Sequence, residues 1–149
     1  MAWCRPYNLG KNIMTKYVFV NGGTKKQRAL VEDVAWWFCE KYFSRFKSFN
    51  IDIDLVNIEG EVNGWCMPID RRACHIEIDK KQKGDDFITC ILHELVHVKQ
   101  YLKGELKDIS ALEQRWKGES HISIDYYDLP WEIEAYHLQE VLLEEYKNA

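Results

Sequence analysis

Two histidines and a glutamate lie inside the most apolar helical pattern of this 149-residue chain. His93, Glu94 and His97 form an H-E-x-x-H motif. At 3.6 residues per turn, His93 and His97 project from one helical face about one turn apart, close enough to bind one ion. Glu94 is then placed to take a proton from water held by that ion. The motif predicts a helix that carries a zinc site.

The residues around the motif support a helix. Asp85 and Asp86 offer an N-cap followed by negative charge in the first turn, and Gly104 ends the pattern. A broad buried stripe is predicted from Phe87, Ile88, Ile91, Leu92, Leu95, Val96 and Val98. The competing interpretation is a core helix whose two histidines form hydrogen bonds and bind no metal.

Length and composition favour a single domain over residues 1–149, since 46% of the residues are hydrophobic and nothing resembles a linker. The net charge of −4 gives no general attraction to nucleic acid or to an anionic membrane surface. No stretch approaches the roughly 18 apolar residues that a membrane span needs, and the N-terminus lacks a signal-peptide core. We therefore expect neither membranes nor nucleic acid as partners, and the oligomeric state stays open.

The cysteines indicate the compartment. The chain has five of them, an odd number, and they form no C-x-x-C pair. They are Cys4, Cys39, Cys66, Cys74 and Cys90. Because most lie within apolar patterns, we expect buried thiols in a reducing environment, and hence a cytoplasmic protein.

The remaining patterns alternate between strands and helices and predict an α+β fold. An N-terminal helix capped by Thr24, a small mixed or antiparallel sheet, the motif helix and a C-terminal helix are expected in this order. The predicted helices cover residues 25–46, 109–117 (short) and 130–147, and the predicted strands cover 17–20, 51–55, a segment from Trp65 that Pro68 shortens, and 74–79. Within the last strand, Cys74, Ile76 and Ile78 share one face.

A catalytic zinc usually takes three protein ligands, so His93 and His97 need a third. The C-terminal helix opens with Pro130 and carries Glu132 and Glu134 before an apolar run. At this point the chain resembles the zincin metallopeptidases of the glutamate-ligand group (gluzincins), especially the small phage-type and ImmA/IrrE-like members. The resemblance is carried by His93, Glu94, His97 and the segment 132–135, and it is compatible with residues 15–147.

The resemblance implies a minimal zincin-like fold and assigns the ligands. Aligning Ala135 with the alanine typical of the group makes Glu132 the third ligand, with Glu134 as the alternative. Tyr136 then occupies the position where the group has an aspartate or asparagine, which usually orients a zinc histidine.

Two other ligand schemes remain open. His121, 24 residues after His97, is a possible third histidine, as in SprT-like zincins. Cys66 is a possible thiolate ligand, as in peptide deformylases, and a lone strand histidine, His75, is a further candidate. His121, Tyr126 and Tyr127 are also candidates to stabilise an oxyanion.

These patterns lead to one functional hypothesis and one rival. The hypothesis is a zinc-dependent metallohydrolase, a peptidase in which Glu94 acts as general base on zinc-bound water. The resemblance implies an extended peptide or protein substrate lying along the strand before the motif helix, Cys74–Asp79, which we expect at the sheet edge. The rival is a zinc-stabilised binding or regulatory module without catalysis. Glu94 argues against it, because structural zinc needs no general base.

Overall fold

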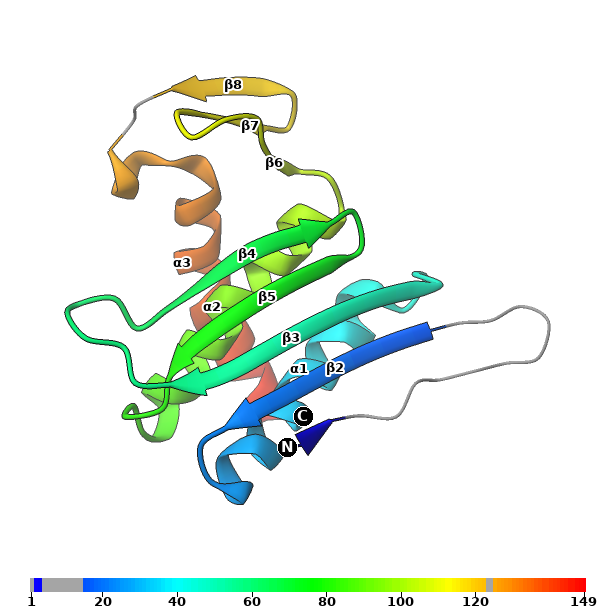
Figure 1. The fold of residues 1–149 in the computed structure, drawn as a ribbon, viewed down its shortest axis with the longest axis vertical. Helices are drawn as coiled ribbons and strands as arrows, with labels where there is room; N and C mark the ends of the chain where they lie inside the picture. The colour runs from blue at the N-terminus through cyan, green and yellow to red at the C-terminus, as the bar shows by residue number, and fades with distance from the viewer. Residues whose placement is uncertain (1, 4–14, 123–124) are drawn as a thin grey trace.

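The computed structural model describes residues 2–3, 15–122 and 125–149, and these form a mixed α+β fold (Figure 1). Its helices are α1 (Lys25–Phe43), α2 (Gly84–Leu102) and α3 (Pro130–Lys147), with a 3₁₀ turn at Tyr126–Asp128. Its strands are β1 (Ala2–Trp3), β2 (Thr15–Gly22), β3 (Ser48–Val56), β4 (Gly64–Asp70), β5 (Ala73–Asp79), β6 (Leu106–Asp108), β7 (Glu113–Trp116) and β8 (Glu119–Ile122). Among these residues, no helix combines the length and apolar character that a membrane span requires.

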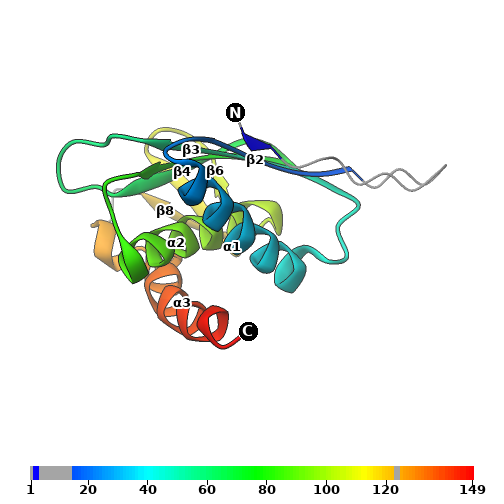
Figure 2. The same cartoon turned by 90° about the horizontal axis from the view of Figure 1, so that it is seen from below.

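A five-stranded sheet organises the fold, with the order β1-β2-β3-β5-β4. Strands β2, β3 and β5 are parallel, and β4 returns antiparallel to β5, so the sheet is mixed as predicted. Helices α1 and α2 cover one face of this sheet, and α3 lies beyond α2 (Figure 2). The core forms between the sheet and the two helices, where Ile53 and Ile76 meet Phe38, Ile91 and Leu95. Helix α2 is therefore enclosed on both sides, which buries its polar residues as well.

The ends of the two helices on the sheet follow from local sequence. At the start of α1, the Thr24 side chain accepts from the Gln27 N–H and the Gln27 side chain accepts from the Thr24 N–H, which is a capping box and confirms the predicted cap. Helix α2 ends at Leu102, and Gly104 just beyond it has a φ of 73°, which suits glycine, with the Glu105 N–H donating to Gln100 O. Its start was predicted two residues too late: Lys83 is the N-cap, and both aspartates lie in the first turn.

The strand expected at the sheet edge lies inside the sheet instead. Strand β5, which includes Cys74–Asp79, pairs with β3 on one side and β4 on the other. Its predicted inner face is right, since Cys74, Ile76 and Ile78 are buried. The edge prediction was wrong because alternation reports which face is buried and says nothing about how many neighbours a strand has. Strand β4 is the edge strand at this end of the sheet.

Strand β4 also runs through Pro68, which was expected to shorten it. The Asp79 N–H donates to Asn63 O (2.8 Å), and in an antiparallel ladder such bonded pairs alternate with unbonded ones. The register therefore turns the main-chain polar groups of Gly64, Cys66 and Pro68 away from β5. Because the missing N–H of Pro68 faces the open edge, the proline costs the ladder no hydrogen bond.

The short helix predicted at 109–117 is absent, and this segment contributes to the antiparallel sheet β6-β7-β8. Lys117 and Gly118 both have positive φ, 49° and 87°, and they form the two-residue connection between β7 and β8. Positive φ at both central residues is the geometry that matches the twist of a tight hairpin. This turn, with glycine in its second position, was the signal for a hairpin.

Candidate metal centre

Three side chains from two helices meet at a buried point between α2 and α3. His93 and His97 come from α2, and Glu132 comes from the first turn of α3. The Nε2 atom of His93 lies 3.1 Å from Glu132 Oε1, and the Nε2 atom of His97 lies 3.2 Å from the same oxygen. All three residues are less than 9% exposed. The helical spacing of the motif and the crossing of the two helices together create this group.

The group has the donors and the size to hold a metal ion. One ligand atom from each residue lies within 4.8 Å of the others. In a tetrahedral site with bonds of 2.0–2.1 Å, as for zinc, neighbouring ligand atoms are about 3.3 Å apart. The observed separations between Glu132 and the two histidines agree with this value. Two imidazoles and one carboxylate leave a fourth position for water or substrate, so the residues present fit a metal ion.

Two glutamines fix the orientation of the histidines. The Nδ1 atom of His93 lies 2.8 Å from Gln139 Oε1, and that of His97 lies 2.7 Å from Gln100 Oε1. An amide oxygen accepts, so each imidazole donates from Nδ1, and its Nε2 is left either to bind an ion or, without one, to donate to Glu132. Sequence reasoning missed both glutamines. Gln100 follows His97 by three residues on the same helix, which was a usable signal, whereas Gln139 is brought in only by the packing of α3.

Glu134, the alternative ligand, belongs to a different cluster. Its Oε1 accepts from Lys99 Nζ (2.8 Å) and from Gln100 Nε2 (3.2 Å). Lys99 also pairs with Glu105 at 3.0 Å. These partners hold the pKa of Glu134 below its usual range although burial acts in the other direction. The structure therefore brings Glu132, and not Glu134, to the histidines.

The pKa values of Glu132 and Glu94 are shifted in opposite directions. Burial by itself would raise the pKa of Glu132, but the hydrogen bonds from His93 and His97 lower it to about 2. Burial raises the pKa of Glu94, against the attraction of the two imidazoles. Among the described residues, Glu94 has no hydrogen bond through its carboxylate. It is the carboxylate beside the group that is available for proton transfer.

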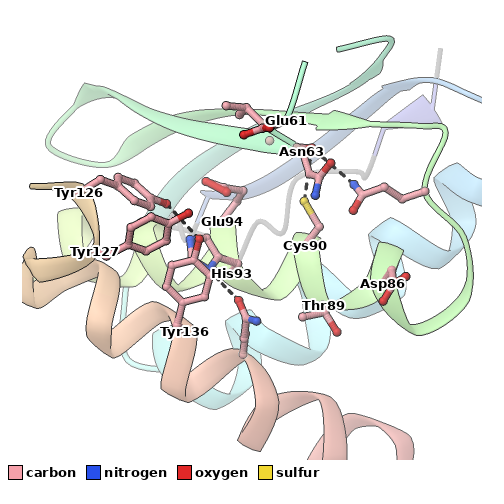
Figure 3. Close-up of a pocket in the computed structure, with 14 residues that line it drawn as sticks. Glu61, Asn63, Asp86, Thr89, Cys90, His93, Glu94, Tyr126, Tyr127 and Tyr136 are labelled. Atoms are coloured by element: carbon pink, nitrogen blue, oxygen red, sulfur yellow. Dashed lines mark hydrogen bonds between the residues drawn. The ribbon is translucent and has the colours of Figure 1, made fainter. Parts of the chain in front are cut away.

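Glu94 and His93 open onto a cleft of about 670 Å³ (Figure 3). The cleft is lined by Glu61, Val62, Asn63, Gly64, Gln82, Asp86, Thr89, Cys90, His93, Glu94, Tyr126, Tyr127, Tyr136 and Gln139. In Figure 3, the three tyrosines stand at one end and Asp86, Thr89 and Cys90 at the other, with His93 and Glu94 between them. The Cys90 thiol also faces this cleft, and burial raises its pKa to about 12.

The tyrosines belong to the wall next to the metal group. The Tyr126 hydroxyl donates to Glu132 Oε1 at 2.9 Å, and the Tyr136 ring packs on His93 with centroids 4.7 Å apart. Tyr136 thus contacts a histidine through its ring, while Gln139 supplies the polar contact expected at position 136. Tyr126, proposed from sequence to stabilise an oxyanion, faces the cleft.

The other sequence candidates lie elsewhere. His121 packs on the Trp131 ring and lines a separate cavity of about 440 Å³ with Asp108 and Gln114, away from the metal group. Cys66 lies on the helix-facing side of β4, where burial and a contact with Cys74 raise its pKa. His75 lies on the outer face of the sheet, 3.7 Å from Asp54. None of these side chains joins the group of His93, His97 and Glu132.

The four cysteines in the described residues, Cys39, Cys66, Cys74 and Cys90, are thiols. Cys4 lies outside the described residues.

Comparisons with protein-family profiles, with curated protein sequences and with solved structures return no match. The geometry of the site is therefore the basis for a functional assignment.

Proposed function

We propose that this chain is a zinc-dependent peptidase of the zincin type, with His93, His97 and Glu132 as the zinc ligands. One observation carries the proposal. A buried ligand group of the right size borders a cleft that is also lined by Glu94, and no described side chain forms a hydrogen bond with the Glu94 carboxylate. A structural zinc would have a closed fourth position and no need of a base. The Nδ1 contacts of both histidines with glutamine add the orienting partners that metal-binding imidazoles normally have.

Glu94 has the central part in the proposed hydrolysis. When bound, zinc supplies Lewis-acid polarisation of the scissile carbonyl and makes water more acidic. Glu94 takes one proton from the attacking water as its oxygen bonds to the carbonyl carbon. It then delivers that proton to the leaving amine as the C–N bond breaks. Its raised pKa brings proton uptake and release closer to neutral pH.

Tyr126 is the donor that we assign to the oxyanion. Its hydroxyl lines the cleft and lies 2.9 Å from Glu132 Oε1, so it is next to the place where the metal group would hold a substrate carbonyl. His121 lines another cavity and has no part in this assignment.

Strand β4 replaces Cys74–Asp79 as the place where an extended substrate would pair. Asn63 and Gly64 line the cleft, and the main-chain groups of Gly64 and Cys66 face the open edge. A peptide in extended conformation can hydrogen-bond to such an edge and pass over Glu94. Within the described residues, no other strand pairs with β4 on this side.

The test measures metal and cleavage together. The chain purified under native conditions should contain one zinc per molecule and should cleave peptides from a protease-digested proteome, with the products identified by mass spectrometry. Glu94→Gln should keep the zinc but lose about 10²- to 10⁴-fold of the cleavage rate. The exposed Glu144→Gln is the matched control and should cleave like the wild type.

Other outcomes contradict the proposal in different ways. A chain that binds zinc and cleaves nothing is the binding module, and a chain that takes up no zinc from a replete medium has neither function. Full activity of zinc-loaded Glu94→Gln would overturn the general-base role.

A further inference from the structure

Strand β4 exposes a row of large apolar side chains on the face of the sheet that the helices leave uncovered. Trp65 and Met67 alternate along the strand and are 44% and 51% exposed, and Ile69, where the pairing with β5 shifts register, is 61% exposed. Figure 2 shows the helices on one side of the sheet, and Cys66, between Trp65 and Met67, faces that side. We call Trp65, Met67 and Ile69 the outer row. A continuous apolar row at an open strand edge usually marks a surface that something covers.

The outer row is confined to the edge. On the same face, the neighbouring strand β5 carries His75 and Glu77, which lie directly opposite Met67 and Trp65. The Trp65 indole N–H donates to Glu77 Oε2 at 3.0 Å, which holds the ring in place on the strand. The outer face of the neighbouring strand β5 is polar at these positions. The apolar surface therefore suits a partner that pairs along the edge of β4 better than one that packs across the sheet.

We propose that the outer row selects substrate, so that the peptidase prefers extended segments with apolar side chains at every second position. The proposal rests on the proposed function. A strand that pairs with β4 turns alternate side chains to the outer face. There, the Cβ atom of each lies about 4.5–5.5 Å from the Cβ atom of the residue directly opposite on β4. Apolar substrate side chains next to Trp65 and Met67 would remove the surface of these residues from water, which is favourable. Polar substrate side chains would bury less apolar surface.

A passing peptide fits this edge better than a second copy of the chain. The edge is continuous with the cleft, since Val62, Asn63 and Gly64 line that cleft and lead directly into β4. Pro68 removes the next edge-facing N–H after Gly64 and Cys66, so the strand offers few donors. A stable dimer buries about 1,200–2,000 Å² in total, far more than three side chains on a short edge provide.

The test begins with the cleavage sites of the zinc-loaded wild type in peptides from a digested proteome. We expect aliphatic or aromatic residues to be enriched at two positions that are two residues apart. A matched pair of peptides is then made from one cleaved sequence, with these two positions either kept or changed to threonine. The triple variant Trp65→Thr, Met67→Thr, Ile69→Thr places β-branched residues, which favour strands, at all three positions and removes the apolar row.

The wild type should cleave the apolar peptide about five- to thirtyfold faster, in kcat/KM, than its threonine counterpart. The triple variant should reduce that ratio to less than about twofold. Leu112→Thr removes a side chain that is 72% exposed and lies off β4, and it should leave the ratio unchanged. As a binding readout, the apolar peptide should slow hydrogen exchange at the Gly64 and Cys66 amides in Glu94→Gln, which does not turn it over.

Each failure has its own meaning. Cleavage without a preference of period two, or a preference that survives in the triple variant, overturns the role of the outer row and leaves the peptidase intact. A wild type that is dimeric in sedimentation, with a monomeric triple variant, makes the row a contact between copies and also overturns it. If the zinc-loaded wild type cleaves no peptide, the proposed function fails, and the selectivity fails with it.

Discussion

Helices α2 and α3 meet through two polar clusters, and the contrast between them explains why one is suited to a metal ion. In the first cluster, Glu132 lies against two imidazole Nε2 atoms. In the second, Glu134 accepts from Lys99 and Gln100. The second cluster neutralises its carboxylate with a cation that the chain itself provides. The first holds lone-pair donors around one point and depends on protons or a metal ion for the positive charge.

The two glutamates are separated by only two residues, about 200° around the helix. This is why they point to different partners although both belong to the opening of α3. Gln100 connects the clusters, because its side-chain oxygen contacts His97 and its nitrogen donates to Glu134 and to Trp131 O. Lys99 and Glu134 thus link α2 to α3 beside the group of His93, His97 and Glu132.

The largest expected effect separates the two glutamates directly. Glu132→Ala should weaken zinc binding by about 100- to 1,000-fold, since a site worth about 10–16 kcal/mol loses one of its ligands. Glu134→Ala should change zinc affinity by less than about threefold, because Lys99 keeps Glu105 and Gln100 keeps Trp131 O. Competition with a chromogenic chelator measures both. The reverse result would move the ligand by two residues along α3.

A smaller effect is expected from the glutamine that orients His93. Gln139→Leu removes the acceptor for the Nδ1 proton and should reduce zinc affinity by about 10- to 100-fold. Gln139→Glu replaces the amide oxygen by a carboxylate oxygen and should restore most of the affinity. The same chelator competition applies. If Leu and Glu at this position bind zinc equally well, Gln139 only fills space beside the imidazole.

Removing the cation tests the second cluster by itself. Lys99→Met leaves Glu105 and Glu134 without their ammonium partner and should lower the free energy of unfolding by about 1–2 kcal/mol. Urea denaturation of the metal-free chain measures the change. A matched change on the surface, Lys41→Met, removes an exposed pair with Glu145 and should cost less than about 1 kcal/mol. Equal costs would mean that the second cluster does not stabilise the helix crossing.

A further test is the pH dependence that should distinguish the clusters. The pKa of His97 is raised: burial lowers it, but the Glu132 hydrogen bond and nearby carboxylates outweigh this. In the metal-free chain, the stability from His97 is present below its unfolded pKa, about 6.5, and is lost as the pH rises through the raised value. The contribution of Glu132, with its pKa lowered from 4.5 to about 2, is present above pH 4.5 and is lost below it.

Zinc must displace the proton of His97, so its affinity should fall by up to about tenfold per pH unit below the raised pKa. The rise in melting temperature on adding zinc should therefore grow from pH 5 to pH 8. The second cluster should be insensitive over this range, since the pKa of Lys99 is raised and that of Glu134 is lowered. A zinc-induced rise that is independent of pH would show that no imidazole proton is displaced.

The sequence by itself determined the local part of the site. Because a helix repeats every 3.6 residues, the spacing of His93 and His97 placed both on one face, and the apolar residues around them placed that face inside. The cap of α1, the glycine that ends α2 and the proline that begins α3 were equally readable, since each depends on residues within one turn. These features need no knowledge of distant neighbours.

Tertiary structure alone decided what depends on packing. The choice between Glu132 and Glu134 follows from how α3 crosses α2, and the contact of Gln139 with His93 spans 46 positions in the chain. The edge position went to β4 because strand pairing is set by chain topology, which the alternation of β5 does not encode. Patterns in the sequence report local geometry and burial, whereas contacts between distant residues depend on the relative placement of whole elements.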